Sequence, residues 1–294
     1  MIKTLELKNI SKVIKDTVIL NDINLSVKTG EILGVIGLNG SGKSSLFKVI
    51  CGMWQNTTGE FFINNTNMTT KYEEFVEKIS FFIESPNLYE NLTVKDNFKI
   101  LNLINDKKDL EWLNFLISKF KLQNFMDEKI KKCSLGTKQK IGIIMSLLNK
   151  GDVIILDEPS NSLDIESVIE LYNIINILKK EGKIIFISSH IIEELESIAD
   201  KFIVLDRGTI ISEHTNIKDF LDVIFTNDIS KECLDSLKSI KEVISINKNI
   251  VTISILDLNR FTQECKNHDL KIIHINKNKN ILRNTLLKNS FKGK

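Results

Sequence analysis

The feature of this sequence that most restricts its fold is the octapeptide Gly37–Ser44, GLNGSGKS. It matches in full the phosphate-binding pattern G-x-x-x-x-G-K-[ST]. The apolar run Glu31–Ile36 precedes it and predicts a buried strand, and Ser45–Ile50 follows at helical spacing. The glycines therefore lie in a strand-to-helix turn, where backbone N–H groups can surround phosphate oxygens.

This turn supplies most of the candidate nucleotide-binding residues. We expect Lys43 to reach the β and γ phosphates and the hydroxyl of Ser44 to bind Mg²⁺. The simpler alternative is a glycine turn beside an ordinary surface lysine. If the turn binds phosphate, the binding residues are Gly37, Leu38, Asn39, Gly40, Ser41, Gly42, Lys43, Ser44 and Ser45.

Two adjacent carboxylates end a second apolar run, Lys150–Pro159. Neighbouring side chains on a strand point in different directions. Asp157 can therefore serve the metal, directly or through water, while Glu158 faces the γ-phosphate and polarises the attacking water. The alternative is a solvated acidic turn after a core strand.

A predicted helix begins between these two motifs, at Cys133–Lys140, CSLGTKQK. Ser134 has the position of an N-cap, and Ile141, Ile144 and Met145 follow at apolar helical spacing. A hydroxyl, a glycine backbone and a helix N-terminus together can form an anion site. Taken alone, the segment is only a capped helix.

Here the chain resembles the ATP-binding cassette family, whose signature is usually written LSGGQ. Ser134 and Gly136 match that signature, whereas Cys133, Leu135 and Thr137 depart from it. The resemblance implies that Ser134, Leu135 and Gly136 act on the nucleotide of a second copy of the chain. It also implies ATP and Mg²⁺ as cofactors.

Two further segments are similar to cassette motifs. Ser160–Asp164 follows Glu158 after one residue, Pro159, like the family's D-loop, and the resemblance implies that Asp164 communicates across a dimer. Ser188–His190 follows an apolar run, and the resemblance implies that His190 hydrogen-bonds the γ-phosphate. A lone histidine at a strand end is otherwise more often structural.

Two positions depart from the family pattern. Glu84 stands where the family has a glutamine, and a carboxylate there can still meet Mg²⁺ or its water. Its Glu-Ser-Pro context resembles the branch that includes bacitracin- and lantibiotic-type resistance and immunity exporters. Ile14 stands where an aromatic ring usually stacks on adenine, and because an aliphatic face stacks less well, we expect GTP to compete with ATP.

Composition limits where such a chain works. The 294 residues are 42% hydrophobic and 27% charged, enough for one α/β core and a small appendage. No apolar run approaches the ~18 residues of a membrane span, and the N-terminus lacks the apolar core of a signal peptide. Four cysteines without metal spacing predict neither zinc nor disulfides, and a net charge of +2 predicts no nucleic-acid partner. We expect a cytoplasmic protein, peripheral at the inner face of the cell membrane.

The fold class that these patterns predict is α/β, a phosphate-loop NTPase core with a parallel sheet, a helical subdomain insert and a small C-terminal α/β appendage. We place the cassette at residues 1–214, with the helical subdomain at about 85–149, and an accessory domain at 215–294. In the accessory domain, 242–246 and 250–255 alternate like two paired strands. The tail 276–294 is basic without an acidic residue, and it either is solvated or touches anionic lipid.

These expectations combine into one functional interpretation. The chain is expected to be the ATP-hydrolysing subunit of a transporter, to dimerise around two ATP, most simply as a homodimer, and to power a separate multi-span membrane permease. The permease is expected to bind near Ser85–Asn91, and the cargo to be an exported peptide antibiotic or other amphipathic substrate. The alternatives are a translation-factor or chromosome-type cassette ATPase and a non-catalytic nucleotide sensor. Intact Glu158 and His190 argue against the sensor.

Overall fold

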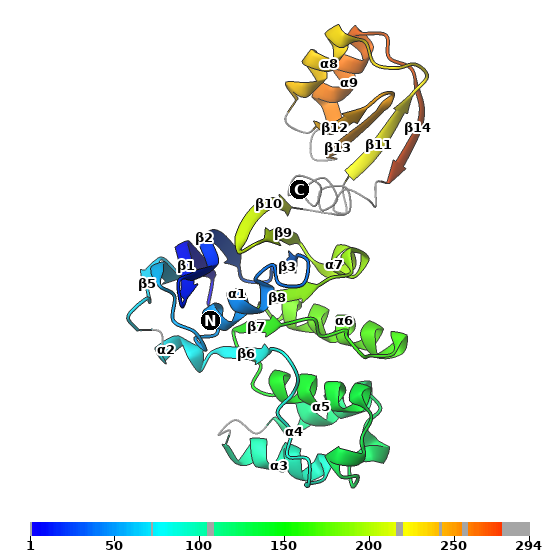
Figure 1. Ribbon diagram of the computed structural model, residues 1–294. Coiled ribbons are helices and arrows are strands. Elements are labelled where there is room, and N and C mark those ends of the chain that lie inside the picture. Colours follow the sequence, from blue (N-terminus) through cyan, green and yellow to red (C-terminus); the bar gives the residue numbers. More distant parts are fainter. Residues whose placement is uncertain are drawn as a thin grey trace. The chain divides into compact units, whose positions relative to one another are not determined.

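The computed structural model describes residues 2–71, 73–104, 109–215, 220–240, 243–254 and 258–277 (Figure 1). The chain divides into two compact units, Met1–Thr215 and Asn216–Lys294, which are described separately below. Most of the basic tail, from residue 278 onward, lies outside the described residues. Within the part of the chain that the structure describes, no helix is both long and apolar enough to cross a bilayer.

A six-stranded sheet forms the centre of the first unit. Three of its four inner strands are buried at every position, as expected for parallel strands covered on both faces. Five strands are mutually parallel and β10 pairs antiparallel at one edge. In sheet order the strands are β10 (Thr209–Thr215), β9 (Lys201–Asp206), β3 (Ile32–Ile36), β8 (Ile184–Ser189), β7 (Val153–Leu156) and β6 (Ile79–Phe82).

A second, antiparallel sheet accompanies the parallel one, in the order β2-β1-β4-β5. This sheet was not part of the predicted parallel-sheet core. Its hairpin of β1 and β2 alternates between buried and exposed positions, which is typical of an antiparallel sheet with one solvent-exposed face. A four-residue helix, α2 (Glu73–Val76), follows this sheet. Its strands are β1 (Thr4–Ile14), β2 (Thr17–Lys28), β4 (Thr58–Ile63) and β5 (Thr66–Asn67).

Three helices pack on the sheets and position the loops at the strand ends. Phe47 of α1 (Lys43–Ile50) packs its ring edge-on against Phe186 of β8, with 6.4 Å between ring centroids. The others are α6 (Ile165–Lys180) and α7 (Ile192–Ile198), both in contact with β8. Because α1 starts at the carboxyl end of β3, the predicted strand-to-helix turn is confirmed.

The insert between β6 and β7 is helical, as predicted. It contains α3 (Val94–Ile104), α4 (Leu110–Lys119) and α5 (Leu135–Leu147), with 3-10 turns at Gln123–Phe125 and Ile130–Lys132. Asp109 caps α4 by accepting a hydrogen bond from Trp112 N at 2.9 Å. In α4, Leu110 is 56% exposed, whereas Trp112 is buried and its indole N–H donates to Leu147 O.

The second unit has the element order β-α-β-β-α-β and a four-stranded antiparallel sheet, β12-β13-β11-β14, an arrangement of the ferredoxin-like type. The predicted strand pair is confirmed, because Asn247 of β12 is the register partner of Ile250 of β13. A separate apolar core includes Phe225, Leu237 and Phe261. The elements are β11 (Phe220–Phe225), α8 (Lys231–Lys238), β12 (Val243–Asn247), β13 (Ile250–Ser254), α9 (Leu258–Asn267) and β14 (Ile272–Lys277).

Candidate active site

The phosphate-binding turn lies between β3 and α1, and its glycines are required by its shape. Gly40 and Gly42 have φ of +80° and +107°, which L-residues rarely adopt. A Cβ on Gly37 would lie 2.5 Å from Leu205 O. Ser41 Oγ is buried, and no described residue hydrogen-bonds to it, so the turn holds a polar atom ready for an added partner.

A cleft of about 610 Å³ opens above this turn, within the size range of sites for small ligands. The turn contributes Asn39, Gly40, Gly42, Lys43, Ser44 and Ser45. Of the remaining predicted binding residues, Gly37 and Ser41 are buried, and Leu38 is 63% exposed with its carbonyl toward Lys43.

The structure places other residues where Ile14 was expected. The cleft is lined by Thr17, Val18 and Ile19 of β2 and by Arg207, while Ile14 is only the register partner of Thr17. Val18 is 54% exposed and gives this wall an apolar side chain. The sequence interpretation missed Arg207, which stands in the β9–β10 turn beside Gly208, whose N–H donates to Ser41 O at 2.8 Å.

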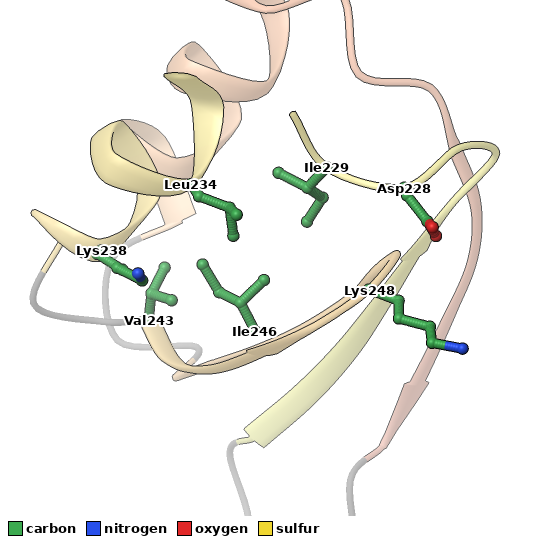
Figure 2. Close-up of a pocket in the computed structure, with 7 residues that line it drawn as sticks. All are labelled: Asp228, Ile229, Leu234, Lys238, Val243, Ile246 and Lys248. Atoms are coloured by element: carbon green, nitrogen blue, oxygen red, sulfur yellow. The ribbon is translucent and has the colours of Figure 1, made fainter. Parts of the chain in front are cut away.

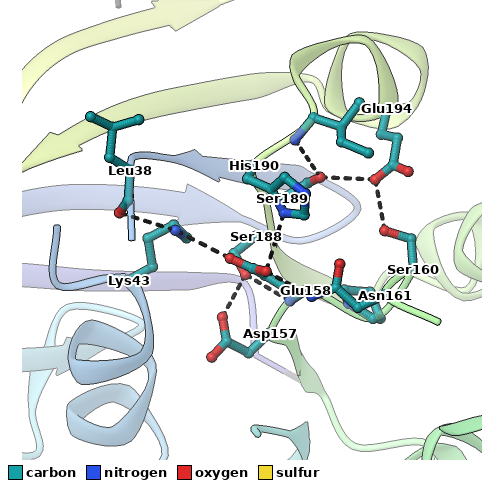
Figure 3. Close-up of polar contacts among 12 residues, drawn as sticks. Leu38, Lys43, Asp157, Glu158, Ser160, Asn161, Ser188, Ser189, His190 and Glu194 are labelled. Carbon is teal, nitrogen blue, oxygen red and sulfur yellow. Dashed lines mark hydrogen bonds and ion pairs between the residues drawn. The ribbon is translucent and has the colours of Figure 1, made fainter. Parts of the chain in front are cut away.

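Lys43 joins the phosphate-binding turn to the acidic motif. Its Nζ donates to Gly37 O at 2.8 Å. It also lies 3.2 Å from Glu158 Oε1 (Figure 3). The side chain is only 6% exposed. A buried cation needs compensating partners, and here they are a backbone carbonyl and the candidate catalytic carboxylate.

Asp157 is held by two serine hydroxyls. Ser44 Oγ donates to its Oδ2 at 2.5 Å, and Ser188 Oγ donates to its Oδ1 at 2.6 Å. Ser188 Oγ also accepts from Glu158 N at 2.8 Å, so that β8 fixes both carboxylate residues of the β7 end. The role of Ser188 was not predicted.

The pair formed by Ser44 and Asp157 suits a hard cation. A hydroxyl and a carboxylate oxygen are the donors that Mg²⁺ prefers, and Mg²⁺ usually takes its remaining ligands from water and phosphate. Among the described residues, no group of three or more His, Cys, Asp or Glu side chains could hold a metal alone. The donor set therefore fits Mg²⁺ that arrives with a nucleotide.

Glu158 receives partners from three sides. Besides Lys43, Asn161 Nδ2 donates to its Oε2 at 2.8 Å, and His190 Nδ1 lies 3.2 Å from the same oxygen (Figure 3). Partial burial raises the pKa of this carboxyl, but the Asn161 hydrogen bond and the Lys43 charge outweigh burial and leave the pKa below its usual value. Glu158 is thus ionised at neutral pH, as a group that polarises water should be.

Glu84, predicted as a metal ligand, lies elsewhere in this structure. Its carboxylate forms an ion pair with Lys48 of α1 and is 63% exposed. Among the described residues, no hydrogen bond joins it to Ser44 or Asp157. The prediction for Glu84 therefore requires this ion pair to open.

The predicted signature residues lie at the start of α5. Ser134 is the N-cap, as expected, with Oγ accepting from Thr137 N at 3.1 Å. Leu135 is 66% exposed. Gly136 packs so closely on the loop after Glu158 that a Cβ would lie 2.7 Å from Ser162 O.

Asp164 has a structural role within the chain. It caps α6, accepting from Ser167 N and Oγ at 2.8 Å, and pairs with Lys140 of α5 at 2.8 Å. The hydrogen bond from Lys140, followed by those from Ser167, lowers the pKa of Asp164. These contacts join α5 to α6 without any second copy.

A residue that sequence reasoning missed connects the two loops around Glu158. Glu194 Oε2 accepts from Ser160 Oγ at 2.7 Å and from Ser189 Oγ at 2.8 Å (Figure 3). Burial, followed by the charge of Glu194, raises the pKa of Tyr172 beside it. The spacing of Glu194 four residues after His190 is the only sequence signal for this contact.

Comparison with known families gives a consistent result. The family model described as "ABC transporter" matches residues 20–161. The lantibiotic transport ATP-binding protein SrtF of Streptococcus pyogenes is 35% identical over 226 residues, which are 76% of this chain and 97% of SrtF. The bacitracin transport ATP-binding protein BcrA of Bacillus licheniformis is 33% identical over 195 residues, 66% of this chain and 64% of BcrA.

A solved structure supports the same fold. The dimeric, ADP- and phosphate-bound structure of the cassette MJ0796 superposes with a TM-score of 0.65 at 24% identity, over 72% of this chain and 98% of that one. The phosphate-binding turn, the Asp157–Glu158 pair and the capped helix at Ser134 are therefore found in a chain with the fold and sequence of cassette ATPases. This chain belongs to the ATP-binding subunits of ABC transporters and is an ATPase of that family.

Proposed function

We propose that two copies of this chain close around two ATP molecules and that hydrolysis drives a separate multi-span membrane permease, which exports a peptide antibiotic or another amphipathic compound. The observation that carries the ATPase part is the convergence of Lys43, Ser44, Asp157 and Glu158 at the carboxyl ends of β3 and β7. Ligands of open α/β sheets bind at this edge.

The turn and Lys43 bind the phosphates. The N–H groups around Gly40 and Gly42 and the start of α1 offer donors and a positive dipole end to an anion. Lys43 supplies the nearest charge. Because it already pairs with Glu158, a phosphate oxygen that binds Lys43 competes with that carboxylate.

Ser44 and Asp157 would hold Mg²⁺, which when bound neutralises charge on the phosphates. Glu158 then polarises the attacking water, with Asn161 and His190 fixing its orientation. His190 is half exposed, so its ring can also meet a γ-phosphate. For the base, the cleft offers Val18 and Ile19 and no aromatic ring among its described lining residues, which supports weak discrimination between ATP and GTP.

The second copy would complete each site. Ser134 and Leu135 are exposed, and Ile165, at the start of α6, is 82% exposed. Such apolar exposure beside a capped helix N-terminus suits burial in a dimer. The dimeric form of MJ0796 makes this assembly reasonable for a chain of the same fold.

The segment 85–91 is the proposed permease contact. Tyr89 is 57% exposed, and its backbone is fixed by the buried Asn97, which accepts from Tyr89 N at 2.9 Å and donates to Tyr89 O at 3.2 Å. A rigid backbone with an exposed aromatic side chain suits a docking surface. Through it the chain would lie at the cytoplasmic face of the membrane.

The cargo proposal rests on the names of SrtF and BcrA. It can be tested by producing the chain together with a candidate membrane permease in a strain sensitive to lantibiotics and bacitracin. Raised tolerance that Lys43→Ala abolishes supports the proposal. If the purified complex hydrolyses ATP but tolerance stays unchanged, the transporter proposal stands and the proposal for this cargo is wrong.

A further inference from the structure

The second unit contains a cavity that the ATPase does not use. It lies between α8 and the β12–β13 hairpin and measures about 530 Å³ (Figure 2). The alignment with SrtF covers 97% of that protein but 76% of this chain, so a length close to that of the second unit has no counterpart in SrtF.

The middle of the cavity wall is apolar. Ile229, Leu234, Val243 and Ile246 line it, and each also belongs to or packs against the core of the second unit. Leu234, Val243 and Ile246 are only half-buried. A ligand with an apolar body would remove their remaining exposed surface from water, which favours binding.

Charged side chains stand at the two ends of this wall. Figure 2 shows Lys238 at the end of α8 and, on the other side, Asp228 and Lys248. Within the described residues, no ion pair or side-chain hydrogen bond engages any of these three. Among the described lining residues, the rim thus carries two cations against one anion. Lys238 stands apart from the acid in Figure 2.

We infer that the cavity binds a small amphipathic carboxylate, whose apolar body lies on the wall formed by Ile229, Leu234, Val243 and Ile246 and whose anionic group pairs with Lys238. The cavity volume lies within the range of small-molecule sites. A purely apolar ligand leaves the rim charges unused, and an amphipathic amine meets a net positive rim. This inference does not depend on the transport proposal, because binding is measured without nucleotide.

The test uses the full chain with labelled Ile, Leu and Val methyl groups and titrates octanoate, followed by NMR. Octanoate should shift the methyl signals of the four wall residues and leave those of the first unit unchanged. Lys238→Met should weaken binding at least about tenfold, the loss expected for one charge-assisted contact. The matched control, Lys266→Met, changes an exposed lysine of α9 outside the cavity and should leave the affinity unchanged.

Octylamine separates apolar attraction from recognition of the anion. It should bind at least about tenfold more weakly than octanoate if the carboxylate contact is real. Equal binding of the two compounds, unchanged octanoate affinity in Lys238→Met, or shifts that avoid the wall methyls would each overturn the inference. Absence of binding by octanoate would do so as well. Preserved methyl spectra of the variants show that they remain folded.

Discussion

Lys43 Nζ lies 3.2 Å from Glu158 Oε1, so the proposed phosphate-binding cation and the proposed catalytic carboxylate are direct partners. Both side chains are largely shielded from solvent, at 6% and 23% exposure. A phosphate that binds Lys43 must therefore weaken or replace its ion pair with Glu158. Affinity for ATP and the protonation and orientation of Glu158 are linked through it.

Glu158→Gln should bind ATP about tenfold more tightly, because a neutral amide competes less well with phosphate for Lys43 and a hydrogen bond to a charged group contributes about 1.5–3 kcal/mol. Turnover should fall at least about 10²-fold, as for loss of a catalytic base. Fluorescent-nucleotide titration and phosphate release measure the two effects. Glu111→Gln, an exposed change on α4, is the control. Wild-type turnover in Glu158→Gln would exclude Glu158 as the base.

Glu194→Ala should reduce kcat about tenfold with little change in KM, since Glu194 positions the loops of Ser160 and Ser189 and does not touch the cleft. The combined variant with Ser160→Ala should lose less than the sum of the two single losses, because the residues share one contact. Steady-state kinetics of wild type, the two single variants and the combined variant give this double-mutant cycle. Glu181→Ala, at the exposed end of α6, should behave as wild type. Fully additive losses would show that Ser160 and Glu194 act separately.

Asp164→Ala should lower the free energy of unfolding by about 1 kcal/mol through loss of the α6 cap, whereas Asp164→Asn should retain most of the cap. The pKa of Asp164 is lowered in the folded state, so its ionic contribution is present above the unfolded pKa of about 3.9 and is lost as pH falls through the lower folded pKa. The stability difference between wild type and Asp164→Asn should therefore shrink on acidification. Urea unfolding at a series of pH values tests this, and a difference that grows toward low pH would be inconsistent with it.

ATP and GTP should bind within about tenfold of each other, a difference below roughly 1.4 kcal/mol, because no aromatic ring is among the described residues lining the cleft. Placing a tyrosine at position 18 or at position 14 shows which residue faces the base, because stacking of a base on an aromatic ring contributes about 1–3 kcal/mol. Val18→Tyr should raise both affinities at least about fivefold and more than Ile14→Tyr does. Competition binding measures all four values. A larger gain in affinity from Ile14→Tyr would show that the base lies against Ile14, as the family pattern indicates.

The motifs of this site could be read from the sequence because each is a short contiguous segment at a strand end. Lys43, Asp157 and Glu158 follow apolar runs, and parallel strands bring their carboxyl ends to one edge. The phosphate-binding turn and the caps at Ser134 and Asp164 depend on local backbone geometry, which residue types reveal directly.

Other parts of the site depend on tertiary packing, which one sequence does not reveal. Val18, and not Ile14, is among the residues that line the cleft, and the β1–β2 pairing that positions both residues includes three register shifts. Glu84 was predicted from its motif position alone, but in the structure its carboxylate forms an ion pair with Lys48 of α1. Glu194 acquires its role from two loops that meet only after β7 and β8 pair.

The most direct test of the shared-site account is the mass of Glu158→Gln with ATP and Mg²⁺, by size exclusion with light scattering. For Glu158→Gln we predict a mass twice the 33.6 kDa of one chain. For the double variant with Ser134→Arg we predict the mass of one chain, because bulk and charge at the start of α5 block closure of the dimer while ATP still binds. Ser118→Arg, an exposed position of α4, should leave the dimer intact. ATP-bound Glu158→Gln that stays at the mass of one chain, or a dimer that survives Ser134→Arg, would contradict the account.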